Sequence, residues 1–184
     1  MFTSTSSVAS EVAEFYSSKV SEQWTVQGSV LEELALVPTC TAETKNPNGS
    51  YFHLSKDIDE NLYYLWVRNV EWNLEDKEIV VRVDFYDEKG SLSYASLRAI
   101  VQKKNSLDVP IDDPKAFLER FMLSKKIRFT VSNHDSKFNI AVDKPIEIAS
   151  GLFKCIDAWE AAKERFVARK KDDSQLQKTP GLKR

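Results

Sequence analysis

Both histidines of the chain are followed two positions later by a serine, which gives the pairs His53/Ser55 and His134/Ser136. Residues i and i+2 of a β-strand point the same way, so each imidazole would have a hydroxyl beside it. An imidazole can donate or accept a proton near neutral pH, and a neighbouring hydroxyl can bind a substrate oxygen. The two pairs are therefore candidates for acid–base catalysis without a metal.

The spacing resembles the paired His-x-Ser/Thr motifs of the two-histidine phosphoesterases. This resemblance implies that His53 and His134 act as acid and base on a cyclic phosphate or RNA-type substrate. Ser55 and Ser136 would then bind phosphate oxygens. The alternative is structural: His53 is an exposed strand residue, and His134 lies with Asp135 in a polar turn between two predicted strands.

Other chemical motifs are lacking in the sequence. The five glycines are scattered and form no phosphate-binding loop, and two histidines with two cysteines offer no zinc-ligand spacing. We therefore expect no metal and no cofactor, although a site made of carboxylates alone stays open.

Two cysteines, Cys40 and Cys155, leave two interpretations. Free cysteine packs as a small hydrophobic residue, so both thiols can be buried in the core. Alternatively, a disulfide joins an early strand to the last helix, which indicates an oxidising compartment.

The aromatic residues Tyr63, Tyr64, Trp66 and Trp72 gather in one predicted strand and the segment after it. Packing in the core or an interface is one interpretation. Stacking on sugars or bases is the other, and it requires that these rings be exposed.

Charge is uneven along a chain whose net charge is −2. Residues 163–184 carry eight Lys and Arg against three acids, while the rest of the chain is acidic. Because catalytic sets are incomplete and the last helix is amphipathic, we expect a non-catalytic protein-interaction or assembly module; binding of nucleic acid through the tail is the alternative. The predicted contact residues lie at the end of that helix: Trp159, Arg165, Phe166, Arg169, Lys170 and Lys171.

The length of 184 residues and the hydrophobic fraction of 42% suit one α+β domain with a substantial core. Alternating apolar residues predict strands at 78–86, 127–131 and 138–142, of which the last two pair antiparallel. Asp113 and Pro114 predict the N-terminus of a short helix through Met122.

Apolar residues at helical spacing predict helices at both ends of the chain. At the N-terminus they are Val8, Val12, Phe15, Tyr16 and Val20. At the C-terminus a stripe of apolar residues predicts a helix over 150–170 that packs on the sheet. The expected fold is an antiparallel, β-sandwich-like sheet of about seven strands with an N-terminal, a middle and a C-terminal helix. The expected divisions are a helical arm over 1–23, a single domain over 24–170 and a flexible basic tail over 171–184.

The element order resembles that of small exported β-sandwich proteins of the invasion-associated locus B type. The resemblance runs over roughly residues 24–160, from Trp24 and Cys40 through the central strands to Cys155 and Trp159. It implies an envelope-located, non-enzymatic sandwich that binds or assembles with other proteins.

Two features of the sequence do not indicate an exported or membrane-spanning protein. No apolar run reaches the length of about 18 residues that a membrane helix needs, and the N-terminus lacks the pattern of a secretory signal. If Met1 is the natural start, we expect a cytoplasmic protein. If the chain is a processed form, a periplasmic or secreted location follows.

Overall fold

The computed structural model describes residues 12–31, 37–90, 92–132 and 137–176, without the side chains of 92 and 170–176. This part of the chain forms ten strands and two helices. The strands are β1 (Val12–Lys19), β2 (Trp24–Leu31), β3 (Val37–Lys45), β4 (Tyr51–Asp57), β5 (Leu62–Arg68), β6 (Glu78–Tyr86), β7 (Leu92–Lys103), β8 (Ser106–Pro110), β9 (Lys126–Val131) and β10 (Lys137–Ala141). The helices are α1 (Pro114–Met122) and α2 (Pro145–Leu176).

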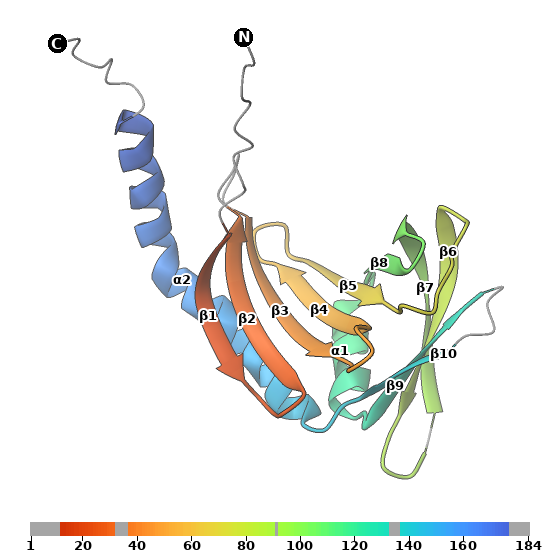
Figure 1. Cartoon of the computed structure of the whole chain (residues 1–184). Helices are drawn as coiled ribbons and strands as arrows, with labels where there is room; N and C mark the ends of the chain where they lie inside the picture. Colours follow the sequence, from red (N-terminus) through yellow and green to blue (C-terminus); the bar gives the residue numbers. More distant parts are fainter. Residues whose placement is uncertain (1–11, 32–36, 91, 133–136, 177–184) are drawn as a thin grey trace, which may run out of the picture.

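All ten strands belong to one antiparallel sheet in the order β1-β2-β3-β4-β5-β8-β7-β6-β9-β10. The first five strands form a meander, because each pairs with its neighbour in the chain. The sheet curves strongly between β1 and β10, so its two halves face each other (Figure 1).

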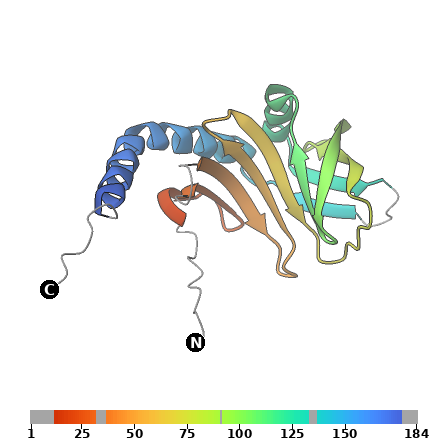
Figure 2. The same cartoon turned by 90° about the horizontal axis from the view of Figure 1, so that it is seen from above.

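Both helices lie on the same side of the sheet, where α2 runs along β1, β2 and β3 (Figures 1 and 2). We call this side the inner face and the opposite side the outer face. Burial alternates along the strands accordingly: in β2, Trp24, Val26, Gly28 and Val30 are buried, and the residues that alternate with them are partly exposed. The core is therefore enclosed by the inner face and the two helices.

The two halves of the curved sheet meet in the core. The Phe52 ring of β4 lies 5.6 Å from the Phe129 ring of β9. Where β2 begins and β10 ends, the indole Nε1 of Trp24 donates to the carbonyl oxygen of Ala141 at 3.0 Å, which links the two strands. These contacts hold early and late parts of the chain side by side.

The predicted N-terminal helix is wrong, because Val12–Lys19 is strand β1 and pairs with β2. A shift in register between Glu14 and Tyr16 marks a β-bulge. The extra residue of a bulge interrupts the period of two, so Phe15 and Tyr16 both pack against the core. The resulting spacing of apolar residues resembles that of a helix.

The predicted seven strands and three helices are likewise wrong, since the chain has ten strands in a single sheet and two helices. One of the extra strands is β1, which lies in the segment predicted as the N-terminal helix. The prediction for 78–86 is confirmed by β6, and that for the middle helix by α1, where Asp113 accepts a hydrogen bond from the Ala116 N–H at 3.0 Å.

The closing helix exists but is longer than predicted, since α2 extends from Pro145 to Leu176. A disulfide between Cys40 of β3 and Cys155 of α2 fastens it to the sheet, with the Cα atoms 6.0 Å apart. This settles the earlier alternatives in favour of the disulfide. Within the described segments, neither helix has the length and apolar character needed to cross a membrane.

Candidate functional site

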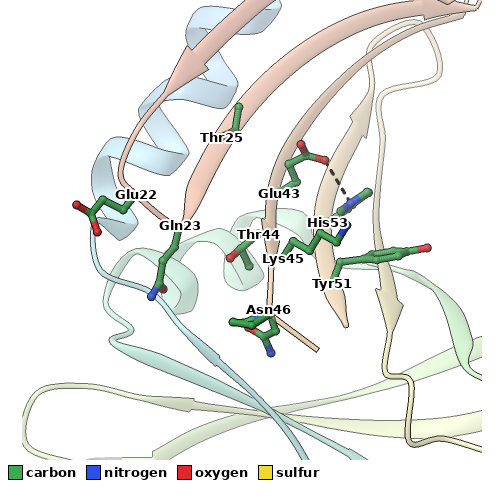
Figure 3. Close-up of a pocket in the computed structure, with 10 residues that line it drawn as sticks. Glu22, Gln23, Thr25, Glu43, Thr44, Lys45, Asn46, Tyr51 and His53 are labelled. Atoms are coloured by element: carbon green, nitrogen blue, oxygen red, sulfur yellow. Dashed lines mark ion pairs between the residues drawn. The ribbon is translucent and has the colours of Figure 1, made fainter. Parts of the chain in front are cut away.

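A pocket of about 540 Å³ opens where β2 begins, β3 ends and β4 begins (Figure 3). Most of the residues that line it are polar, and Asn46 and Pro47 of the turn over 46–49 lie at one side. In this turn the Gly49 N–H donates to the Asn46 carbonyl, and Gly49 has a φ of 87°, which glycine adopts readily. The lining residues are Glu22, Gln23, Thr25, Glu43, Thr44, Lys45, Asn46, Pro47, Tyr51 and His53.

His53 and Glu43 form the polar centre of this pocket. They lie directly opposite each other on β4 and β3, and His53 Nε2 is 3.3 Å from Glu43 Oε2 (Figure 3). Burial lowers the pKa of His53 to about 4. Burial also raises the pKa of Glu43, against the opposing effect of Lys45. At neutral pH the imidazole is therefore neutral, and its Nε2 faces the Glu43 carboxylate.

Aromatic rings fix the orientation of His53. The Tyr51 ring stacks on the imidazole at 4.8 Å, and the Trp66 indole meets it edge-on at 5.3 Å. Tyr51 and Trp66 are themselves 5.1 Å apart, and the Arg68 guanidinium lies 5.9 Å from the centre of the Tyr51 ring. The result is a preorganised group of side chains on the outer face of β3, β4 and β5.

The structure places Ser55 on the same face as His53, as the spacing predicts, but not in the pocket. Ser55 is 3% exposed, and its hydroxyl lies 2.9 Å from the Thr41 hydroxyl. His134 and Ser136 lie outside the described residues. The polar contact of His53 is Glu43, so, in the described part of the chain, no serine, threonine or cysteine nucleophile is bonded to it.

The predicted aromatic cluster divides between the two faces. Trp72 is 3% exposed and packs near Phe138, and Tyr63 contacts the core. Trp66 is 39% exposed on the outer face. Sequence reasoning missed Glu43 and Tyr51 as neighbours of His53, since their proximity depends on strand register across β3 and β4.

The predicted partner-binding residues differ in how far they are exposed. Trp159 is 4% exposed, and its ring lies 5.2 Å from Phe15 of β1. Phe166 is half-buried at 5.6 Å from Trp159, whereas Arg165 and Arg169 are exposed. The side chains of Lys170 and Lys171, and residues 177–184 of the predicted tail, lie outside the described part.

No group of three or more His, Cys, Asp or Glu side chains capable of holding a metal occurs among the described residues. Comparisons with protein-family models, with curated proteins and with solved structures found no match for this chain. The resemblance to the invasion-associated locus B type therefore stays a prediction from element order.

Proposed function

We propose that this protein is a non-catalytic interaction module that contacts a protein partner through the end of α2. The observation that carries the proposal is the length of α2 beyond its packed part. Ala162 is the last buried residue among those whose side chains are described, yet the helix continues to Leu176. We call residues 163–176 the α2 extension; at 1.5 Å per residue it is about 21 Å long.

The first part of α2 is held firmly on the inner face. Ile148, Leu152 and Trp159 are buried, and the disulfide at Cys155 adds a covalent link to β3. The extension projects past the strands in Figure 1. Helical segments of this length are marginal in water unless one face is packed. A partner that packs on the extension would supply the missing contact.

The surface of the extension suits an acidic partner. Arg165 and Arg169 are four residues apart and so lie on one side of the helix, beside the half-buried Phe166. Arginine and aromatic side chains are the types most enriched at the centres of protein interfaces. Residues 163–184 also carry five more positive than negative charges. Trp159 is left out of the proposed contact, because its ring packs within the fold.

The test compares affinity capture from the native source by the wild-type chain and by Arg165→Glu/Arg169→Glu. Proteins lost from the charge-reversed variant are then purified and titrated against both chains by calorimetry. We expect the double variant to lower affinity by at least about tenfold, because two cations at the contact become acids.

Lys154→Glu is the matched control, since Lys154 is exposed on the packed part of the same helix. This control should retain the partner. A partner that binds the double variant and the wild type equally well would remove the α2 extension as the contact, and equal losses in the double variant and the control would remove it too.

A further inference from the structure

A second surface lies on the outer face of the other half of the sheet, on β7, β6, β9 and β10. We call it the cationic face. Its strand positions carry five cations, which lie on four different strands, and two acids. The cations are Arg82, Arg98, Lys126, Arg128 and Lys137, and the acids are Glu78 and Asp84. This surface thus has an excess of three positive charges on a chain whose net charge is −2.

Two tyrosines lie among these cations. Tyr94 is 57% exposed, and the Arg82 guanidinium lies 4.5 Å from the centre of its ring. The Tyr86 ring has Lys126 Nζ at 4.5 Å and the Arg128 guanidinium at 4.9 Å. Aromatic faces and positive charges therefore occur together on neighbouring strands.

Asp84 arranges the middle of the cationic face. It is 6% exposed and lies opposite Tyr94 on β7 and opposite Arg128 on β9. Its carboxylate accepts from Arg82 Nε at 2.6 Å, which holds this guanidinium against Tyr94. Arg128 Nε donates to the Asn139 amide oxygen at 3.2 Å. Two guanidinium groups are thus fixed in place before any ligand binds.

Other acids lie near the ends of this surface. Asp76 and Glu78 stand before and at the start of β6, near Arg98, and Glu88 beyond the end of β6 pairs with Lys125 at 3.2 Å. The centre, around Arg82, Tyr94 and Arg128, is where positive charge and an exposed ring coincide.

We propose that the cationic face binds single-stranded nucleic acid. Cations attract the phosphate backbone, and exposed tyrosine rings offer the planar surfaces on which unpaired bases stack. An acidic polypeptide would use the cations but has no need of Tyr94. A duplex hides the faces of its bases, so it would not use the ring either. Neighbouring apolar side chains, Val80 at 48% and Ile100 at 47% exposure, extend the surface available to bases.

Fluorescence anisotropy with a labelled 12-nucleotide oligo-dT tests the proposal on the full chain. Tyr94→Ala should weaken binding by about tenfold or more, whereas Tyr94→Phe should retain it, because stacking needs the ring and not the hydroxyl. Arg98→Ser/Lys137→Ser should weaken binding and flatten its salt dependence, whose slope of log affinity against log salt is expected near about −2 for three phosphate contacts. All these side chains are exposed, and thermal unfolding checks that each variant is folded.

Arg165→Glu/Arg169→Glu separates this proposal from the partner contact on α2, and it should leave oligo-dT binding intact. Three results would overturn the proposal: no binding by the wild type, equal binding of Tyr94→Ala and wild type, or loss of binding only in the α2 variant. Competition by poly-glutamate or by duplex DNA as strong as that by oligo-dT would also overturn it, by assigning the face to an acidic protein or to polyanions in general.

Discussion

Burial and a neighbouring carboxylate act on His53 in opposite directions. Desolvation favours the neutral imidazole, while Glu43 Oε2 at 3.3 Å from Nε2 would favour the charged one. The side chain of His53 is only 20% exposed and is flanked by Tyr51 and Trp66, so burial prevails and its pKa falls to about 4. His53 is therefore neutral at neutral pH and becomes charged only in acid.

We expect acid to destabilise the protein through His53. In the unfolded chain a histidine takes up a proton near pH 6.5, while the folded one stays neutral down to about pH 4. The unfolded state then binds more protons within this window, so stability falls by about 2 kcal/mol as the pH drops from 6.5 to 4. Urea denaturation at several pH values measures the fall.

His53→Gln removes this titration, and its stability should depend less on pH than that of the wild type between pH 4 and 6.5. Just above pH 4.5, Glu43 has the opposite effect on stability, because its pKa is raised in the folded state. Glu43 is present in both the wild type and His53→Gln. An NMR titration that finds His53 protonating near pH 6.5 would contradict the prediction.

Gly28 is a position where no side chain fits. A Cβ there would lie 2.5 Å from Phe15 Cε2 and 2.8 Å from Cys155 Sγ, which is closer than such atoms approach. We expect Gly28→Ala to destabilise the fold by about 1–3 kcal/mol, because the Phe15 ring and the disulfide-bonded Cys155 sulfur must shift to make room. Urea denaturation measures the change, with Ser29→Ala on the outer face as the control, which should stay within about 0.5 kcal/mol.

At the scale of elements, α2 works as a clamp with two kinds of fastening. Its apolar side covers the inner face of β1, β2 and β3, and the Cys40–Cys155 disulfide joins it to β3. The covalent link closes a loop with a sequence separation of 115 residues, which restricts the unfolded chain strongly.

Reduction of this disulfide should lower stability by about 2–4 kcal/mol, or about 10 °C in the unfolding midpoint for a chain of this size. Calorimetry with and without a reductant measures the shift. The unfolding midpoint of Cys40→Ala/Cys155→Ala should lie near that of the reduced wild type and should not change when a reductant is added. Two free thiols in the untreated protein, counted by alkylation and mass spectrometry, would contradict the assignment.

The elements that the sequence predicted correctly are those whose signals are local. The alternation through Val81, Val83 and Phe85 marks β6, and the cap Asp113 marks α1. The bulge beside Phe15 gave β1 the spacing of a helix, and this could be recognised only from its pairing with β2. The Glu43–His53 pair was equally hidden, because it depends on the register of two strands that the pattern leaves ambiguous.

At the scale of the whole molecule, the first strands pack against elements that lie late in the sequence. The Trp24 indole bonds to Ala141, the Ser21 hydroxyl donates to Asp143 at 3.1 Å, and α2 covers the first three strands. Strands β1, β2 and β3 thus obtain their inner packing from α2, which begins only at Pro145. Contacts so distant in sequence favour slow, all-or-none folding.

A chain ending at Lys144 should therefore fail to fold. It lacks the helix that buries the inner side of β1, β2 and β3, including the surface against which Leu152 and Trp159 pack. We expect no cooperative thermal transition by circular dichroism. A chain ending at Phe166 is the control; it keeps the buried part of α2 and should melt within about 2 °C of the full chain. A sharp transition in the shorter chain would contradict this view of the clamp.

The disulfide also has a consequence for biosynthesis. Cys40 leaves the ribosome long before Cys155, which follows it by 115 positions. The native bond can form only after Cys155 has been synthesised, and until then the Cys40 thiol is open to other oxidants and thiols. Electrophoresis without reductant should therefore distinguish chains that extend past Cys155 from nascent chains interrupted before it, because only the former can contain the large covalent ring.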